Sequence, residues 1–209
     1  MKRSERTSRP PRAAGKRPEL LELAKKVFSE SGYNAASLRE IGARAGMSAA
    51  ALYYHFESKQ DLLRAIVVDA LDRAIAVLMA ELSRGGEPLD RLRNLVRAHI
   101  VFTCENSMET KIIYEDAHFL NRLDFALVRE KQISILNIYR SYIAELSSLG
   151  IACVADATAS AFNLLSVING VHAWLRPNRR LTHGQAIDQT IQFIVGGLCH
   201  ATRAAPEGE

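Results

Sequence analysis

Apolar residues recur at intervals of three and four over most of the chain, and no stretch shows sustained alternation between apolar and polar positions. The first spacing places apolar side chains on one face of an α-helix, whereas alternation would indicate a strand. Glycine, proline and polar caps divide the pattern into predicted helices over residues 18–31, 38–45, 48–56, 58–83, 88–105, 108–116, 119–148, 153–175 and 183–201. The pattern therefore predicts an all-α fold without a β-sheet.

Two of the short predicted helices are joined by a turn that contains glycine. Ser37 stands before the first of them with Glu40 three residues later, which is the capping-box arrangement of a helix start. Gly46 closes that helix, and Ser48 is the N-cap of the next one. This order is typical of a helix-turn-helix, whose second helix enters the major groove of DNA.

The charge of the chain is unevenly distributed. Of its 209 residues 48% are hydrophobic, which is enough for a substantial core, and the net charge is +4. Residues 1–59 hold 12 Lys and Arg against 6 Asp and Glu, whereas residues 60–209 hold 15 against 17. A basic first segment on a nearly neutral body indicates a polyanionic partner, either DNA or an anionic membrane surface.

Residues 1–17 are predicted to form a flexible basic arm, because they contain seven basic side chains, one acidic one and almost nothing apolar to bury. Such an arm either contacts DNA or serves as a solubilising tail. It lacks the interleaved large apolar residues that would hold it on a membrane. Without an apolar leader or a long uncharged apolar segment, the protein is expected to be cytoplasmic and not membrane-bound.

Residues 48–59 have the composition of a recognition helix with its flanking phosphate contacts. The front end is small, which allows the backbone to approach base edges in a groove about 12 Å wide; these residues are Ser48, Ala49, Ala50 and Ala51. The far end carries groups that can donate to phosphate oxygens, on Tyr53, Tyr54, His55 and Lys59. Arg39, near the start of the preceding helix, is the best candidate for bidentate readout of guanine.

The segment SLREIGARAGMSAAALYYHFESKQDLL, residues 37–63, resembles the DNA-binding signature of the TetR family of transcriptional repressors. The resemblance implies a DNA-binding domain over residues 18–63 and a helical effector-binding and dimerisation domain over residues 64–209. It places Tyr53, His55 and Lys59 on phosphates. It places Ser37 and Leu38 on the DNA backbone, and Ala49 and Tyr54 at recognition positions. Ala50 stands where the family often has glycine, and a half-buried structural aromatic is the alternative for Tyr53.

The last two long predicted helices are rich in small and apolar residues, so they suit either helix packing between subunits or a plain internal core. The resemblance favours dimerisation through these two helices as a four-helix bundle. A dimer also matches a palindromic operator, because its two reading helices can lie about 34 Å apart.

Residues 99–146 and 167–198 are similar to the effector domain of TetR-family regulators of fatty-acid and steroid catabolism that respond to acyl-CoA thioesters. The similarity rests on His99, Glu105, the Glu115–His118 region, Arg129, Tyr139, Asn169, Gly170 and residues 174–177. It implies an apolar tunnel with cations near its mouth. Candidate pocket residues are Phe102, Ile112, Ile113, His118, Phe119, Phe162, Leu165 and Trp174, for which plain core is the alternative. Candidate cations are Arg122, Arg129, Arg176, Arg179 and Arg180, for which a solvated surface role is the alternative.

Other chemistry has little support. Glu115 and His118 have the spacing of a di-metal ligand pair, but the second such motif and the two further glutamates are absent. Three widely separated cysteines indicate neither a disulfide framework nor a Cys-type zinc site. No phosphate-binding loop, dinucleotide fingerprint or nucleophile motif appears, so an enzyme in a helical bundle is the weaker class and no metal or cofactor is expected.

The sequence therefore predicts a homodimeric, ligand-responsive repressor that binds palindromic operator DNA and is released by a small apolar effector. An acyl-CoA thioester is the first candidate effector, and a drug-like or aromatic ligand of an efflux or aromatic-degradation regulator is the alternative. The helix over residues 58–83 is expected to transmit the signal as a lever.

Overall fold

The computed structural model describes residues 16–174 and 182–199, and over these ranges the chain is helical without a strand, as predicted. The basic arm up to residue 15 and the candidate cations Arg176, Arg179 and Arg180 lie outside the described residues. The helices are α1 (Lys16–Ala35), α2 (Leu38–Arg44), α3 (Ala49–Tyr53), α4 (Lys59–Leu82), α5 (Pro88–Glu105), α6 (Ser107–Glu115), the 3₁₀ helix η1 (Ala117–Phe119), α7 (Arg122–Ser148), α8 (Ala157–Trp174) and α9 (His183–Cys199).

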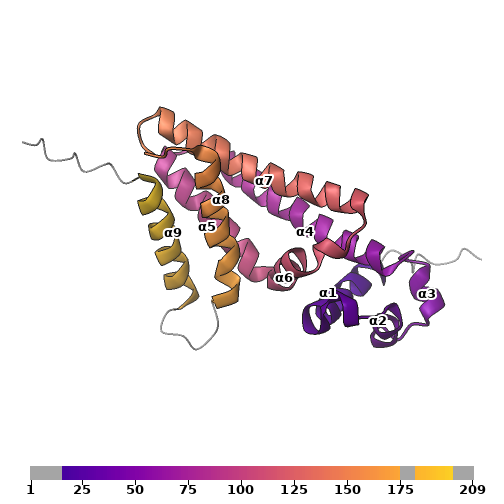
Figure 1. Ribbon diagram of the computed structural model, residues 1–209. Coiled ribbons are helices and arrows are strands. Elements are labelled where there is room, and N and C mark those ends of the chain that lie inside the picture. Colours follow the sequence, from indigo (N-terminus) through magenta and orange to yellow (C-terminus); the bar gives the residue numbers. More distant parts are fainter. Residues whose placement is uncertain (1–15, 175–181, 200–209) are drawn as a thin grey trace, which may run out of the picture.

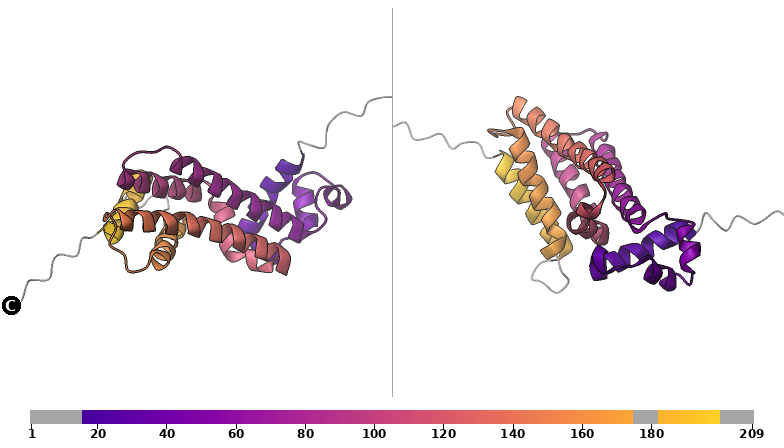
Figure 2. Two further views of the ribbon diagram at one scale, coloured as in Figure 1. Left: turned by 90° about the horizontal axis from the view of Figure 1, so that it is seen from above. Right: turned by 45° about the vertical axis from the view of Figure 1, so that its right-hand side comes forward.

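Two long helices, α4 and α7, run side by side along the length of the molecule (Figures 1 and 2). The short helices α2 and α3 lie with α1 at one end of this pair (Figure 1). Helix α5 packs against α4, α8 and α9. Helix α4 is continuous across the predicted domain boundary at residues 63 and 64, so it belongs to both ends of the molecule. Among the described residues, no helix is both long and apolar enough to cross a membrane.

Serine caps fix the starts of α2, α3 and α4. The Oγ atoms of Ser37, Ser48 and Ser58 accept hydrogen bonds from backbone N–H groups three residues later, at 3.1, 3.2 and 3.0 Å. Gly46 has φ of 64°, a left-handed conformation that favours glycine and ends α2. Gly42 lies close under the turn, since a Cβ there would be 3.3 Å from the Met47 carbonyl oxygen. The helix-turn-helix geometry predicted from these residues is confirmed.

Several predicted boundaries differ from the structure, and at the starts of α7 and α8 a polar side chain caps the backbone at a later residue than predicted. Helix α1 kinks at Gly32 (φ 76°) instead of ending there. Helix α7 starts at residue 122 rather than 119, since the Asn121 side chain accepts from the N–H groups of Leu123 and Asp124, each at 3.0 Å. Helix α8 starts at residue 157 rather than 153, and the side chain of Asp156 accepts from the N–H of Ala159 at 2.6 Å.

The predicted basic arm also extended two residues too far. Lys16 and Arg17 belong to α1, and Arg17 is used within the fold. Its guanidinium donates to the backbone carbonyl of His55 at 2.6 Å and lies 4.2 Å from the centre of the Phe56 ring. Arg17 thus satisfies a carbonyl just after α3 and holds α1 against the end of the helix-turn-helix.

The two ends of the molecule meet at a joint between α1 on one side and α6 with η1 on the other. Tyr33 of α1 stacks on Phe119, with ring centres 5.2 Å apart, and its backbone N–H donates to the Asp116 carboxylate at 3.3 Å. Lys111 of α6 donates to the Ser29 carbonyl at 2.7 Å. These contacts attach α1 directly to α6 and η1, in addition to the connection through α4.

A buried ion cluster lies in the same joint. The ammonium of Lys25 is 2.8 Å from the carboxylate of Glu109, and both side chains are 8% exposed. Arg73 of α4 reaches the same carboxylate at 3.3 Å, and the exposed Glu22 reaches Lys25 at 2.6 Å. Burial lowers the pKa of Lys25, but the glutamate partners outweigh it and raise the pKa above 10.5. The cluster therefore remains charged at neutral pH.

We expect Glu109→Gln to lower the free energy of unfolding by about 3 kcal/mol, because it leaves the buried Lys25 without its buried counter-ion. Glu22→Gln is the matched control on the same lysine, and its loss should stay below about 1 kcal/mol since Glu22 is exposed. Urea denaturation at pH 7 measures both. If the two variants lose the same free energy of unfolding, burial of the Lys25–Glu109 pair does not increase its contribution to stability.

The contribution of Glu109 to the free energy of unfolding should also depend on pH. Burial would raise the pKa of its carboxyl, but Lys25 and Arg73 hold the pKa below its ordinary value of 4.5. A lowered pKa gives stability that is present above the ordinary value and is lost as the pH falls through the folded-state value. The difference in stability between the parent protein and Glu109→Gln should therefore be constant from pH 7 to about pH 5 and shrink in more acidic urea titrations.

Candidate DNA-binding surface and effector cavity

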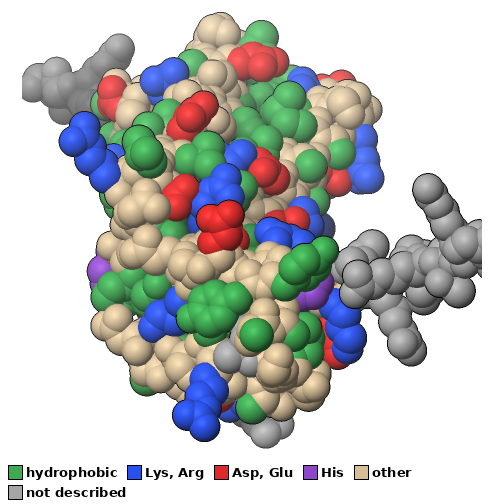
Figure 3. All heavy atoms as spheres, turned by 90° about the vertical axis from the view of Figure 1, so that its right-hand side faces the viewer, with side chains coloured by type: hydrophobic (Ala, Val, Ile, Leu, Met, Phe, Trp, Pro, Cys, Tyr) green, Lys and Arg blue, Asp and Glu red, His purple; other side chains and the backbone are tan. Residues whose placement is uncertain are grey.

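The helix-turn-helix exposes two aromatic rings at the outer end of the molecule. Tyr53 is 55% exposed and Tyr54 is 80% exposed. Two large aromatic side chains exposed next to each other are typical of an interaction surface. In Figure 3, whose lower half carries this end, basic side chains are scattered among apolar and uncharged ones and acidic side chains are few. This surface is compatible with a polyanion.

A shallow depression brings several predicted DNA-binding residues together at the start of α2. It is lined by Ala36, Ser37, Leu38, Arg39, Tyr53, Glu57, Ser58 and Lys59. The hydroxyls of Ser37 and Ser48 accept cap bonds from the backbone, which leaves each hydroxyl proton for a phosphate or a base. Leu38 is buried at 9% exposure, so its side chain belongs mainly to the core.

The two arginines of α2 differ in what holds them. Arg44 is bound by the carboxylates of Glu30 and Glu40, each at 2.9 Å. Arg39 is exposed and makes no ion pair with any residue that the structure describes. Its five N–H donors are therefore available for a phosphate or for the two acceptors of guanine.

Lys59 does not have the position predicted for a phosphate contact. Its ammonium donates to the backbone carbonyls that end α1, those of Tyr33, Ala36 and Asn34, at 2.8, 3.0 and 3.4 Å. It also lies 4.2 Å from the centre of the Tyr33 ring. These bonds occupy its three N–H donors in this conformation, so the predicted phosphate contact would require the ammonium to leave the end of α1. The lysine instead caps α1 from the first turn of α4.

The remaining residues of α3 and its end lie on the exposed side. The imidazole of His55 packs edge-on against the ring of Tyr54, with centres 5.3 Å apart. Ala50 is exposed beside Ser48, and the side chain of Ala49 is not among those described. Contacts of these residues with DNA remain predictions.

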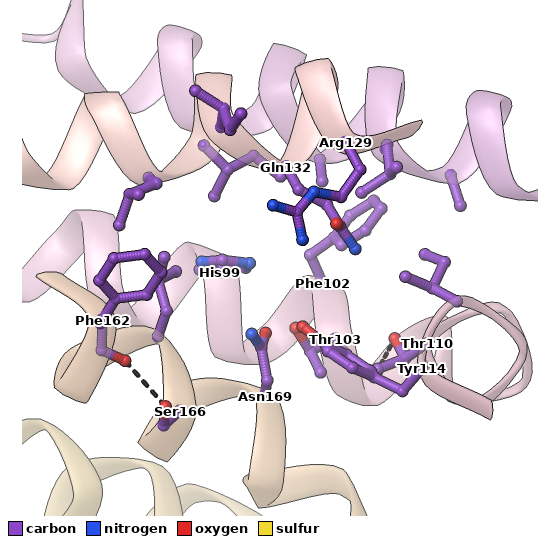
Figure 4. Close-up of a pocket in the computed structure, with 18 residues that line it drawn as sticks. His99, Phe102, Thr103, Thr110, Tyr114, Arg129, Gln132, Phe162, Ser166 and Asn169 are labelled. Carbon is purple, nitrogen blue, oxygen red and sulfur yellow. Dashed lines mark hydrogen bonds between the residues drawn. The ribbon is translucent and has the colours of Figure 1, made fainter. Parts of the chain in front are cut away.

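A cavity of about 290 Å³ lies between α4, α5, α6, α7 and α8. Its wall is mostly apolar, from Ala70, Leu71, Ala74, Phe102, Ile113, Ile133, Ile135, Leu136, Phe162 and Leu165. Figure 4 shows polar side chains converging on the same space from several helices. They are His99, Thr103, Thr110, Tyr114, Arg129, Gln132, Ser166 and Asn169. A concave apolar site with a few polar groups is the usual form of a small-molecule pocket.

The predicted pocket residues divide into two groups. Phe102, Ile113, Phe162 and Leu165 line the cavity, as does the candidate cation Arg129. His118, Phe119 and Arg122 do not line it, so the structure does not bring them together with the other predicted pocket residues. The first two lie in η1. Phe119 stacks on Tyr33 in the joint, and the rings of His118 and Phe119 have their centres 3.9 Å apart. The side chain of Trp174 is not among those described.

The pocket residues predicted from the sequence did not include most of the polar lining residues, although His99, Arg129 and Asn169 are among those that carry the similarity to the effector domain. His99, Phe102 and Thr103 share one face of α5, and Arg129, Gln132 and Leu136 share one face of α7. In the sequence, such a residue could be recognised only as a polar position among the apolar positions of one helix face. This signal is weak, because the cavity forms only where that face meets other helices that are distant in sequence.

His99 is the most deeply placed polar group of the cavity, at 5% exposure. Its Nδ1 lies 3.0 Å from the hydroxyl oxygen of Tyr139, which is fully buried. Burial lowers the pKa of His99 from 6.5 to about 4, so the imidazole is neutral at neutral pH. Burial also raises the pKa of Tyr139 well above 10, so its hydroxyl keeps its proton.

Helix α6 connects the cavity to the joint. Thr110, Ile113 and Tyr114 of this helix line the cavity, and Glu109 and Lys111 of the same helix bind α1. Among the described residues, no group of three His, Cys, Asp or Glu side chains could hold a metal ion. Helix α6 thus forms part of the cavity wall and also contacts α1.

Known proteins resemble the chain over most of its length. Residues 20–66 match the family described as bacterial regulatory proteins, tetR family, and residues 85–198 match the tetracyclin repressor-like C-terminal domain. The chain is 29% identical over 186 residues to the HTH-type transcriptional activator FasR of Mycolicibacterium smegmatis, covering 88% of this chain and 84% of FasR. It is 31% identical over 202 residues to the HTH-type transcriptional repressor KstR2 of the same organism, covering 90% of this chain and 93% of KstR2.

A solved structure of AibR in complex with isovaleryl coenzyme A and operator DNA is also similar. It has a TM-score of 0.77 and 26% sequence identity, covering 88% of this chain and 97% of AibR. The helix-turn-helix, the helical effector domain and these matches agree. The chain therefore belongs to the TetR family of transcriptional regulators, which bind DNA and are not enzymes.

Proposed function

We propose that the protein is a homodimeric repressor that binds palindromic operator DNA and is released when a short acyl-CoA thioester enters the cavity. The observation that carries this proposal is the double role of α6, which lines the cavity with Thr110, Ile113 and Tyr114 and holds α1 through Glu109. A ligand that moves α6 acts on the DNA-binding helices without an intermediate element.

The size of the cavity supports a short acyl group. About 290 Å³ is at the lower end of the range for small-ligand sites, roughly 300–1,000 Å³. A coenzyme A moiety would not fit within this volume, so only the acyl end would enter. Arg129 is the one charged residue among the described lining residues and is exposed, so its guanidinium can meet a phosphate at the mouth. The complex of the similar protein AibR with isovaleryl coenzyme A supports the same ligand class.

An aromatic or drug-like effector is the alternative. Phe102 and Phe162 both line the cavity and could pack against an aromatic ring. This alternative leaves the role of Arg129 without an explanation, because such ligands need not carry a phosphate.

Dimerisation through α8 and α9 is supported by a large apolar side chain that the single chain leaves in water. Phe193 of α9 is 69% exposed and does not line the cavity. An isologous interface of these two helices that covers this ring would set two recognition helices on successive turns of a palindrome.

For release, the ligand must bind the released form better than the DNA-bound form. A change from mostly bound to mostly free requires a difference of roughly 5 kcal/mol between the two forms. The contacts of α6 offer such a difference, because sliding this helix would separate Glu109 from Lys25 and Lys111 from the Ser29 carbonyl.

For DNA binding, we expect Arg39→Ala to weaken binding to the cognate palindrome by about 1–3 kcal/mol and to leave binding to a scrambled duplex much less affected. Tyr53→Phe should weaken binding to both duplexes alike, since it removes a donor to a phosphate. Fluorescence anisotropy with the palindrome upstream of the protein's own gene measures these affinities. Equal losses for Arg39→Ala on both duplexes would assign Arg39 to the phosphate backbone instead.

Lys59→Met tests whether that lysine caps α1 or contacts a phosphate. Loss of the cap on α1 should lower the melting temperature, while the dependence of operator affinity on salt stays unchanged because no phosphate contact is lost. The measurement is a salt titration of operator binding beside a thermal melt. A slope reduced by about one unit per site would show that Lys59 turns outward to a phosphate on DNA.

For effector binding, a short branched acyl-CoA should raise the melting temperature and lower operator affinity at least tenfold, because it binds the released form preferentially. At about 100 times its dissociation constant it should add about 2.7 kcal/mol of stability. Free coenzyme A is the control and should do neither, while a panel of aromatic acids tests the alternative effector class. Operator affinity that no acyl-CoA alters would refute the thioester as effector while leaving DNA binding in place.

A further inference from the structure

His99 presents one edge of its ring to the cavity and the other to the protein core. Its Nδ1 is 3.0 Å from the hydroxyl of Tyr139, a residue that does not line the cavity. Within the described residues, Tyr139 is the hydrogen-bonding partner on the Nδ1 edge of the ring. Because His99 lines the cavity and its Nδ1 partner does not, we assign the opposite edge of the ring, with Nε2, to the cavity side (Figure 4). The state of Nε2 therefore decides what the deep part of the cavity can recognise.

The buried hydroxyl of Tyr139 sets that state. It has one proton to donate and two acceptors within reach, His99 Nδ1 at 3.0 Å and the Leu95 carbonyl at 3.5 Å. Leu95 lies inside α5, where its carbonyl already accepts the N–H four residues later. Donation to Nδ1 is the shorter and better bond. A neutral imidazole that accepts at Nδ1 carries its proton on Nε2.

Two hydroxyls of the cavity wall are engaged elsewhere. Thr110 donates to the backbone carbonyl of Asn106 at 3.0 Å, and Ser166 donates to that of Phe162 at 2.8 Å. Each uses its single proton within its own helix. The Nε2–H of His99 is thus a donor that the protein holds ready and does not itself use.

We propose that the Nε2–H of His99, held in this tautomer by Tyr139, is a specificity-determining donor that binds the neutral carbonyl oxygen of an acyl thioester. This inference rests on the proposed function for the class of ligand. It assigns the recognition of the thioester group, as distinct from the acyl chain or the coenzyme, to one atom. Tyr139 is a positioning residue, because it acts through His99.

A neutral carbonyl suits this position better than a carboxylate. The low pKa of His99 shows that its surroundings oppose a positive charge on the ring. A carboxylate placed there would lose its hydration without gaining an ion pair from the imidazole. Arg129, the one charged residue among the described lining residues, is exposed and can serve the anionic part of the ligand at the mouth.

The tautomer can be measured in the ligand-free protein by ¹⁵N NMR of the His99 ring. The expected signal is that of an Nε2–H imidazole at neutral pH, and Tyr139→Phe should convert it to a mixture of tautomers. Tyr142→Phe is the matched control, because Tyr142 is on the same helix and donates to the Pro88 carbonyl at 2.7 Å without lining the cavity. An Nδ1–H imidazole in the parent protein would overturn the proposal, whatever the effector is.

Recognition of the carbonyl can be measured by calorimetric titration with an acyl-CoA and with the S-alkyl-CoA thioether of the same chain length. The thioether lacks only the carbonyl oxygen. The parent protein and Tyr142→Phe should bind the thioester at least about fivefold more tightly, as expected for one neutral hydrogen bond. Tyr139→Phe should reduce this preference to within about twofold, mainly by weakening thioester binding.

The outcomes separate this proposal from the proposed function. Equal affinities for thioester and thioether in the parent protein would refute the role of His99 while leaving acyl-CoA as the effector. If neither compound binds, the effector class is wrong and the carbonyl assignment falls with it. Tighter binding of the free acid than of the thioester would show that Arg129 and His99 together read a carboxylate, which also overturns the proposal.

Discussion

The ion pair of Lys25 and Glu109 is the interaction on which the arrangement of the two ends of the molecule depends. Both charges are removed from water, so each needs the other at hydrogen-bond distance, and a small sliding of α6 along α1 would leave two poorly solvated ions. Such a pair tolerates few intermediate geometries. The stack of Tyr33 on Phe119 adds a second contact that depends on the same alignment. The joint therefore has one well-defined arrangement in this structure, and a change at the cavity must either preserve it or break it.

Much of the fold could be predicted from local signals. The serine caps of α2, α3 and α4, the glycine after α2 and the helical spacing of apolar residues are short-range features, and the structure confirms the elements that they predict. Boundaries moved where a side chain such as Asn121 caps the backbone at a different residue. Local sequence therefore determined the presence and type of the helices better than their ends.

The features of the candidate sites that could not be predicted come from contacts between residues distant in sequence. Lys59 stands where a phosphate contact was expected, but the open carbonyls at the end of α1 lie next to it and take its three donors. Phe119 is apolar and close in sequence to cavity residues, but it packs on Tyr33 instead. The donor state of His99 depends on a tyrosine forty residues further along the chain. None of these pairings leaves a periodic signal in a single sequence.

The place of Arg17 has a consequence for how the protein can be labelled. Because this side chain binds the His55 carbonyl and covers the Phe56 ring, the beginning of α1 lies within one side-chain length of the end of α3. Any group attached at Lys16 would therefore sit next to the reading helix rather than on the opposite side of the domain. An environment-sensitive dye at that position would report occupancy of the DNA surface, whereas a bulky affinity tag there would compete with the duplex for the same space.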